Sequence, residues 1–290
     1  MTGGIPRVRI GPAGWSYADW QGRVYPEAAG RQFDRLAYLA QYFDTIEINS
    51  SFYRLLTPAI TEQWVRRVAS RPEFKFTAKL YRAFTHQRDE ATVEDERQFK
   101  LAIEPLAQAG KLGAILAQFP WSFKRTRDAR VYLQKLLDQF HEYPLVVEFR
   151  HASWDREEVY RSLAERGVGF CNIDQPLLDR CIAPSDHVTA AVAYVRLHGR
   201  NADQWFAQSS DAAARYDYLY SPEELAPWVD RIRHMASQAD EVYVITNNHF
   251  QGKGVVNALE IKSMMLGEPV PVPEPLQRAY PRLSAVARPL

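Results

Sequence analysis

The sequence is poor in the features that mark secreted, membrane-spanning and strongly charged proteins. Its two cysteines, Cys171 and Cys181, form neither a disulfide framework nor a paired metal-ligand motif. The first residues, MTGGIPRVRI, contain no apolar signal-peptide segment, and no apolar run is long enough to cross a bilayer. The formal net charge of +1 creates no overall field that would attract nucleic acid or an anionic membrane. These absences predict a soluble cytoplasmic protein with no membrane partner.

Sequence motifs that bind nucleotide cofactors or activate a serine nucleophile are also absent. Gly11 and Gly14 follow the first strand candidate but do not form the G-x-G-x-x-G pattern of dinucleotide-binding folds. The chain contains no phosphate-binding P-loop, no G-x-S-x-G and no S-x-x-K. The sequence therefore predicts no cofactor, and no motif identifies a reaction.

Strand patterns and helix patterns alternate along the chain. Ile46 and Ile48 alternate with Glu47 and Asn49, and this period of two is typical of a strand. Helical patterns separate most of the eight strand candidates, which are residues 8–15, 45–53, 74–80, 113–119, 145–151, 167–174, 193–199 and 241–249.

This alternation predicts an α/β fold, and a single-domain TIM-like (β/α)8 barrel accounts for it best. We expect the barrel to span residues 1–266 and the proline-rich tail, residues 267–290, to lie extended on the surface. An open doubly wound sheet is the alternative. It is disfavoured because the first strand lacks the glycine pattern of that fold.

Polar residues interrupt the strand candidates near their carboxyl-terminal ends. Alternate residues of a barrel strand point inward, and the active sites of TIM barrels lie at the carboxyl-terminal end. On this parity, we expect a set of polar side chains to converge there: Glu47, Asn49, Lys79, Gln118, Glu148, Arg150, Arg196, His198 and Asn248.

The charged members of this set could form either an internal ion network or a ligand pocket. A network would pair Glu47 and Glu148 with lysine and arginine side chains. Removing charges from water costs several kcal/mol per ion, and stability alone would favour Val, Ile and Leu instead. We therefore favour a polar ligand pocket with mixed charges.

Glu148 and Arg150 are two residues apart on one strand face, so about 6.5–7 Å separates them along the strand. At that spacing we expect no ideal direct pair, so each side chain needs a partner across the barrel. The candidates are Lys79 or Arg196 for Glu148, and Glu47 or Asp174 for Arg150.

Several segments together resemble the YecE-like family, also known as the domain of unknown function 72. They occur in the family's order between about residue 8 and residue 266: GPAGWSYADWQGRVYP, FDTIEINSSFYRL, FTAKLYRAFTH, ILAQFPWSF, VVEFRHASW, YVRLHGR and VYVITNNHFQGKGVVNAL. The pair Pro12–Ala13 departs from the small Ser-Gly type pair that is more frequent in the family. The resemblance implies a TIM-like barrel and no settled activity.

A metal site is the first chemistry that the polar set could support. Carboxylates with one imidazole suit Mg²⁺ or Mn²⁺. The candidate ligands are Glu47, Glu148, Asp174 and His198. The lysine and arginines interleaved with them would neutralise the carboxylates and repel a cation, so the sequence predicts no bound metal.

Glycoside hydrolysis and anion binding are the other two chemistries. Glu47 and Glu148 could act as acid and nucleophile if about 5–5.5 Å apart, or as acid and base if farther apart. Lysine, arginine and histidine side chains could instead bind a phosphate or carboxylate. The catalytic candidates are Glu47, Glu148 and His198, and the ligand-binding candidates are Trp15, Asn49, Tyr53, Lys79, His86, Gln118, Arg150, Asp174, Arg196 and Asn248.

The sequence thus predicts a small phosphorylated or hydroxyl-rich ligand or substrate, and leaves open whether a hydrolase, an isomerase or no enzyme results. The alternative is a non-catalytic module that binds nucleic acid or protein. Aromatic loops with Arg200 and Arg215 could stack on bases. The near-neutral charge argues against nucleic acid but leaves this alternative open.

Overall fold

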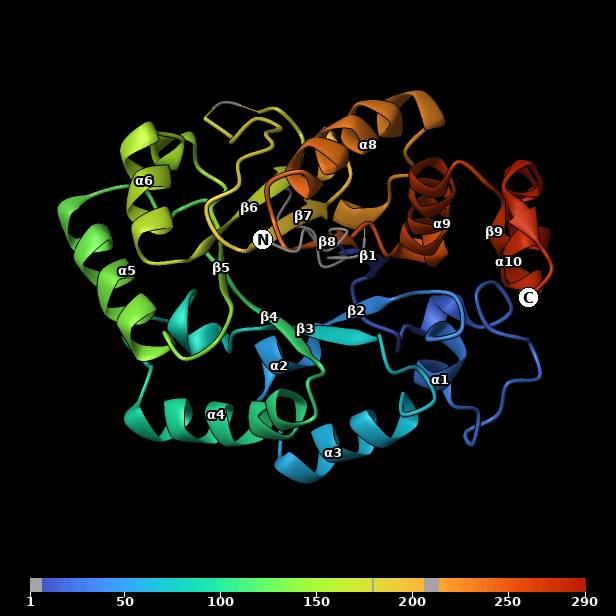
Figure 1. Cartoon of the computed structure of the whole chain (residues 1–290), viewed down its shortest axis with the longest axis horizontal. Helices are drawn as coiled ribbons and strands as arrows, with labels where there is room; N and C mark the ends of the chain where they lie inside the picture. The colour runs from blue at the N-terminus through green and yellow to red at the C-terminus, as the bar shows by residue number, and fades with distance from the viewer. Residues whose placement is uncertain (1–6, 179, 206–213) are drawn as a thin grey trace.

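Eight parallel strands form the centre of the computed structural model, which describes residues 7–178, 180–205 and 214–290 (Figure 1). Hydrogen bonds join them in the order β1-β8-β7-β6-β5-β4-β3-β2. Their bounds are β1 Arg7–Pro12, β2 Thr45–Ile48, β3 Lys75–Lys79, β4 Leu112–Gln118, β5 Leu145–Glu148, β6 Gly169–Asp174, β7 Val192–Leu197 and β8 Glu241–Thr246.

The first two strands, β1 and β2, almost complete the ring. Ala13 and Glu47 form an isolated parallel bridge, and the Gly14 amide donates a hydrogen bond to the Glu47 carbonyl at 2.8 Å. These contacts join β1 to β2 at the carboxyl-terminal ends of the two strands, and we call this junction the barrel seam. The molecule is a nearly closed TIM-like (β/α)8 barrel with one domain. This confirms the predicted fold class and rules out the open doubly wound alternative.

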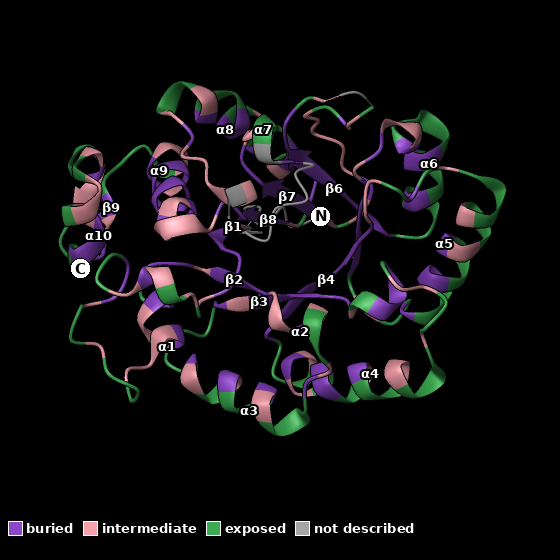
Figure 2. Ribbon diagram, turned by 180° about the vertical axis from the view of Figure 1, so that it is seen from behind, coloured by how far each residue is buried: buried purple, intermediate pink, exposed green. Residues whose placement is uncertain are grey.

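Helices surround the barrel on its outside (Figure 1). Their inner faces are buried against the strands, whereas their outer faces are exposed (Figure 2). The bounds are α1 Arg35–Leu39, α2 Ser50–Tyr53, α3 Pro58–Arg67, α4 Val93–Gln108, α5 Arg127–Gln139, α6 Glu157–Glu165, α7 Ala202–Trp205, α8 Pro222–Ala236, α9 Lys253–Leu266 and α10 Glu274–Ala279. Within the described ranges, no helix has the length and apolar character needed to cross a membrane.

The carboxyl-terminal segment packs on the barrel, whereas the sequence led us to expect an extended surface tail. Leu276 and Leu283 are completely buried, and Arg282 forms an ion pair with Glu260 of α9 at 2.7 Å. Burial of the apolar residues that lie between the prolines holds the segment against the barrel. Its elements are β9 Val270–Pro271, α10 and β10 Ala287–Arg288.

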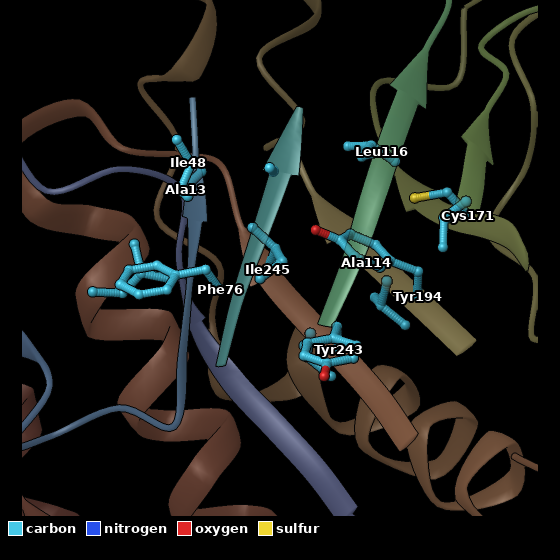
Figure 3. Packing of buried hydrophobic residues seen from close by; sticks show 14 of the residues in the cluster. Ala13, Ile48, Phe76, Ala114, Leu116, Cys171, Tyr194, Tyr243 and Ile245 are labelled. Atoms are coloured by element: carbon cyan, nitrogen blue, oxygen red, sulfur yellow. The ribbon is translucent and has the colours of Figure 1, made fainter. Parts of the chain in front are cut away.

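Side chains fill the barrel interior below its carboxyl-terminal end. The rings of Tyr194 and Tyr243 lie 6.1 Å apart inside the barrel (Figure 3). At the amino-terminal end, Lys75 forms an ion pair with Glu241 at 2.8 Å, and Tyr243 donates a hydrogen bond to the same carboxylate at 2.5 Å. The interior is therefore a packed core, as in other barrels of this size. The carboxyl-terminal end is left as the place for a site.

The close approach of β1 and β2 at Gly11 provides a test of the barrel seam. A Cβ atom on Gly11 would lie 1.8 Å from the Thr45 carbonyl oxygen. We expect Gly11→Ala to lower the free energy of unfolding by roughly 1–3 kcal/mol, because the strands must separate to make room. Urea denaturation followed by circular dichroism measures this change.

Gly30→Ala is the matched control, since nothing lies within 4 Å of a Cβ atom added there. We expect that variant to change stability by less than about 0.5 kcal/mol. Equal stability of the two variants would contradict the seam described here.

Candidate functional site

Arg196 of β7 joins two carboxylates from different strands at the carboxyl-terminal end of the barrel. Its Nη2 donates to Oε1 of Glu47 at 2.6 Å, and its Nη1 donates to Oε2 of Glu148 at 2.7 Å. The three side chains are at most 1% exposed. We call Glu47, Glu148, Arg196 and the neighbouring His198 the ion cluster. The pairing of Glu148 with Arg196 is one of the two partners that the sequence predicted for Glu148.

The second oxygen of each carboxylate also accepts hydrogen bonds. Oε2 of Glu47 accepts from the Tyr194 hydroxyl at 2.9 Å. Oε1 of Glu148 accepts from Nε of Arg150 and from Nε2 of His198, both at 3.1 Å. Both buried carboxylates are therefore held by donors on each oxygen, as a stable buried ion pair requires.

The direct contact between Glu148 and Arg150 differs from the expectation that two residues on one strand face lie too far apart to pair. The reason is local: β5 ends at Glu148, so Arg150 lies beyond the regular strand spacing. Its side chain turns back onto the carboxylate. The predicted partners for Arg150, Glu47 and Asp174, bind other arginines instead.

His198 is a neutral side chain within the ion cluster. Burial lowers the pKa of His198 to about 3, although the charge of Glu148 opposes this shift. The Asn247 side-chain amide donates to Nδ1 at 3.0 Å, so the imidazole proton lies on Nε2 and points to Glu148. Burial opposes ionisation of Glu148, but the charge of Arg196 outweighs it and keeps the pKa of Glu148 well below its usual value.

Lys79, the last residue of β3, lies beside the ion cluster. Its Nζ donates to Oε1 of Gln118 at 3.1 Å and lies 4.1 Å from the centre of the Phe52 ring. Among the described residues, no carboxylate lies within ion-pair distance of this amine. Burial, reinforced by the charge of Arg196, lowers the pKa of Lys79 to about 7. Near neutral pH, the amine and ammonium forms are both populated.

A cavity of about 530 Å³ lies over this group of residues. It is lined by Gly14, Trp15, Ser16, Tyr17, Asn49, Ser50, Tyr53, Arg54, Trp64, Lys79, Arg150, Arg196, Tyr216, Asn247 and His249. Six of the residues selected from the sequence are therefore in the lining: Trp15, Asn49, Tyr53, Lys79, Arg150 and Arg196. Four others contact lining residues without lining the cavity themselves: Glu47, Gln118, Glu148 and His198.

Aromatic side chains form one wall of the cavity. Trp15 and Trp64 meet edge to face with their ring centres 5.0 Å apart. Tyr17 stacks on His249 at 4.3 Å, and the ring of Tyr216 lies 4.9 Å from the same imidazole. The wall thus offers flat apolar faces opposite the charged side chains.

The remaining three selected residues, His86, Asp174 and Asn248, also do not line the cavity. His86 donates to or accepts from the Thr85 hydroxyl at 2.9 Å and is not in the lining. Asp174 accepts from the indole of Trp228 at 2.6 Å and pairs with Arg200 at 2.7 Å. Its carboxylate therefore binds residues on the outside of the sheet, so Asp174 is not the partner across the barrel that the sequence offered for Arg150.

The inward orientation expected for Asn248, which follows β8, was wrong. Asn248 donates to Oδ1 of Asn257 on α9 at 2.8 Å, and the Thr246 hydroxyl bonds to the Gly254 carbonyl at 2.8 Å. Asn247 is the residue of this segment that faces inward, toward His198. β8 is buried on both faces, so apolar residues occur on both. Its sequence therefore has no alternation of polar and apolar residues that would identify the inward face.

The geometry also bears on the metal-site alternative. Asp174 points away from the barrel interior, and Arg196 lies between the carboxylates of Glu47 and Glu148. Within the described part of the chain, no group of three or more His, Cys, Asp or Glu side chains is arranged to hold a metal ion. The predicted absence of a metal stays a prediction.

The fold and this end of the barrel define a (β/α)8-barrel protein with a buried ion cluster beneath an aromatic-walled cavity. The chain belongs to the DUF72 family, whose description is "Protein of unknown function", and the family matches residues 9–280. This confirms the family that the sequence resembles. The match also extends into the carboxyl-terminal segment that packs on the barrel.

Relatives of known sequence or structure are similar to this chain over nearly its whole length. The UPF0759 protein YunF of Bacillus subtilis is 28% identical over 275 residues, which cover 89% of this chain and 94% of YunF. A crystal structure of a DUF72 family protein from Thermotoga maritima is 36% identical, with a TM-score of 0.78, covering 90% of this chain and 99% of that one. A DUF72 family structure from Enterococcus faecalis also has a TM-score of 0.78, at 25% identity, covering 89% and 95%.

Replacement of Glu148 tests the energetic role of the ion cluster. Glu148→Gln keeps the side-chain shape but leaves the buried guanidinium of Arg196 with one carboxylate. We expect the free energy of unfolding to fall by roughly 3–5 kcal/mol. Glu94→Gln, which breaks an exposed pair with Arg97, is the control and should leave the stability nearly unchanged, because exposed ion pairs contribute little. A Glu148→Gln melting temperature within a few degrees of the parent would show that the cluster does not hold the fold together.

The low pKa of the buried histidines predicts acid sensitivity. An unfolded histidine binds a proton below about pH 6.5, whereas folded His198 does so only near pH 3, so protonation favours the unfolded state. Burial similarly lowers the pKa of His249, which is half-buried, to about 4. We expect the free energy of unfolding to decrease from pH 6.5 to pH 5.

Urea titrations across this range measure the effect. His198→Gln should flatten the decrease, because it removes one of the groups that bind a proton only on unfolding. The exposed His141, replaced by Gln, should leave the slope unchanged. Parallel pH profiles for the parent and His198→Gln would contradict the neutral state assigned to His198.

Proposed function

We propose that the cavity binds a small phosphorylated, hydroxyl-rich molecule, such as a sugar phosphate, in the cytoplasm. The observation that carries this proposal is the charge of the lining. Three arginines and Lys79 line the cavity, and no aspartate or glutamate is among its described lining residues: the arginines are Arg54, Arg150 and Arg196. Lys79 adds positive charge in its ammonium form. An anion entering this space gains charge-assisted hydrogen bonds without meeting a like charge.

The arginines have donors available for a phosphate group. The described side-chain hydrogen bonds of Arg150 engage Nε alone, which leaves its terminal nitrogens to meet a ligand. Nε of Arg196 is buried and makes no hydrogen bond within the described part of the chain. A planar guanidinium with two parallel donors matches the geometry of phosphate oxygens.

The rest of the lining suits a sugar-like body. Asn49, Ser16 and Ser50 offer polar groups for hydroxyls, and Trp15 and Trp64 offer apolar faces. The volume of about 530 Å³ lies within the usual range for small-molecule pockets. Polar groups combined with aromatic surface are the composition such pockets commonly have.

The carboxylates support the site from below. Glu47 and Glu148 have no exposed surface, and their oxygens accept hydrogen bonds from protein donors. A glycosidase acid or nucleophile must reach the sugar, and neither side chain lines the cavity. We therefore assign Glu47, Glu148 and His198 to the positioning of Arg196 and Arg150 for ligand binding.

Ligand-induced stabilisation tests the proposal. We expect glucose 6-phosphate and related sugar phosphates to raise the melting temperature, whereas the same sugars without phosphate should leave it unchanged. Arg54→Gln removes a lining cation that lies outside the ion cluster. We expect it to weaken binding about tenfold or more, because a hydrogen bond to a charged group contributes roughly 1.5–3 kcal/mol.

Arg66→Gln is the matched control, since Arg66 is exposed on α3 and does not line the cavity. Isothermal titration calorimetry gives the affinities of the parent and both variants. Failure of all phosphorylated compounds to bind would overturn the proposal. Binding of oligonucleotides with a steep salt dependence would favour the nucleic-acid module instead.

A further inference from the structure

Lys79 differs from Lys111, which is also buried, and from the half-buried Lys75 in what its amine contacts. Nζ of Lys75, on the same strand, pairs with both oxygens of Glu241 at 2.8 and 3.0 Å. Nζ of Lys111 donates to two backbone carbonyls at 2.7 and 2.8 Å. Nζ of Lys79 has one described acceptor, Oε1 of Gln118, and the side chain is only 8% exposed. A lysine that only stabilised the fold would have its buried charge paired.

The surroundings of Lys79 favour the neutral amine. Burial is the main cause, and the charges of Arg196 and Arg150, which line the same cavity, add to it. The charges of Glu47 and Glu148 oppose this effect without reversing it. The Phe52 ring, whose centre lies 4.1 Å from Nζ, covers the amine on one side. Burial and a neighbouring cation are the two devices by which proteins activate a lysine nucleophile.

Gln118 holds the amine in a defined orientation. Nε2 of Gln118 donates to the Phe119 carbonyl at 2.8 Å, which turns Oε1 toward Lys79. The neutral amine then donates one hydrogen to Gln118, and its lone pair points away from that acceptor. Because Nζ lies at the carboxyl-terminal end of β3 and lines the cavity, the lone pair is accessible to a bound ligand.

We propose that Lys79 is a nucleophile that forms an imine with an aldehyde or ketone group of the ligand, and this proposal rests on the phosphorylated ligand class proposed above. The Nζ lone pair attacks the carbonyl carbon, and the carbonyl oxygen takes a proton from solvent to give a carbinolamine. Loss of a water molecule, with release of the nitrogen proton to solvent, gives the C=N bond. Amine and carbonyl compound thus become imine and water, with no oxidant or reductant.

The ligand class follows from this position of the amine. The arginines hold the phosphate, and Lys79 meets a carbonyl carbon elsewhere on the same molecule. A phosphorylated aldehyde or ketone carries both groups. A protonated imine withdraws electrons from the adjacent carbon, so the adduct would prepare a neighbouring C–H or C–C bond for cleavage.

Reductive trapping of the whole chain tests the proposal. The probe is pyridoxal 5′-phosphate, a phosphorylated aldehyde, followed by sodium borohydride, whose hydride adds to the imine carbon and fixes the adduct. We expect peptide mass spectrometry to find Lys79 labelled at least tenfold faster than Lys75 or Lys111. Lys79→Met should lose this adduct, with circular dichroism confirming that the variant is folded. Labelling spread over exposed lysines, with Lys79 unmodified, would overturn the proposal.

The pH dependence of labelling provides a second test that needs no variant. A lysine with a pKa of about 7 should reach half its maximal labelling rate near pH 7. An ordinary lysine would do so near pH 10.4. A half-maximal rate near pH 10 would overturn the assignment of Lys79 as the activated amine.

Two further probes separate this proposal from the one on which it rests. Pyridoxal carries the same aldehyde without phosphate, so equal trapping of Lys79 by both compounds would support the nucleophile and contradict the phosphate site. Glycerol 3-phosphate carries phosphate without a carbonyl. Its binding, together with unmodified Lys79 in the trapping experiment, would support the phosphate site and overturn the nucleophile.

Discussion

The guanidinium of Arg196, held between the carboxylates of Glu47 and Glu148, is the interaction on which the rest of the site depends. It joins β2, β5 and β7 across the end of the barrel, where backbone hydrogen bonds do not reach. Glu148 in turn positions Arg150 and His198. Because truncation of one member leaves the others charged and buried, the cluster couples the stability of the barrel to the geometry of the cavity.

This arrangement explains how a protein of nearly zero net charge has a cationic cavity. Glu47 and Glu148 lie beneath the arginines and do not line the cavity, so the charged side chains among its described lining residues are arginines and Lys79. The carboxylates of Glu47 and Glu148 are paired with Arg196, and Glu148 also pairs with Arg150. Among the described residues, Lys79 has no carboxylate within ion-pair distance. Lys75, which lies nearer the amino-terminal end of the same barrel, is paired with Glu241.

The sequence predicted the barrel and the convergence of its polar residues because several strands carry a polar residue between apolar neighbours. It favoured a ligand pocket over an internal ion network and did not predict how closely Arg196 binds both glutamates. This alternation identifies Glu47 and Arg196 as inward-facing. It fails at Asp174 and Asn248, whose polar groups serve helices α8 and α9 on the outer face. It also misses the aromatic wall, because Tyr17, Tyr216 and His249 come from connections whose course no strand period describes.

A crystal structure of the protein with a bound sugar phosphate tests the central claim most directly, namely that the ion cluster presents a cationic cavity to a phosphorylated ligand. The account predicts phosphate oxygens within hydrogen-bond distance of Arg150 or Arg196, with Arg196 still joining the two glutamates. Phosphate bound elsewhere, or Glu47 and Glu148 released from Arg196 to contact the ligand, would contradict it.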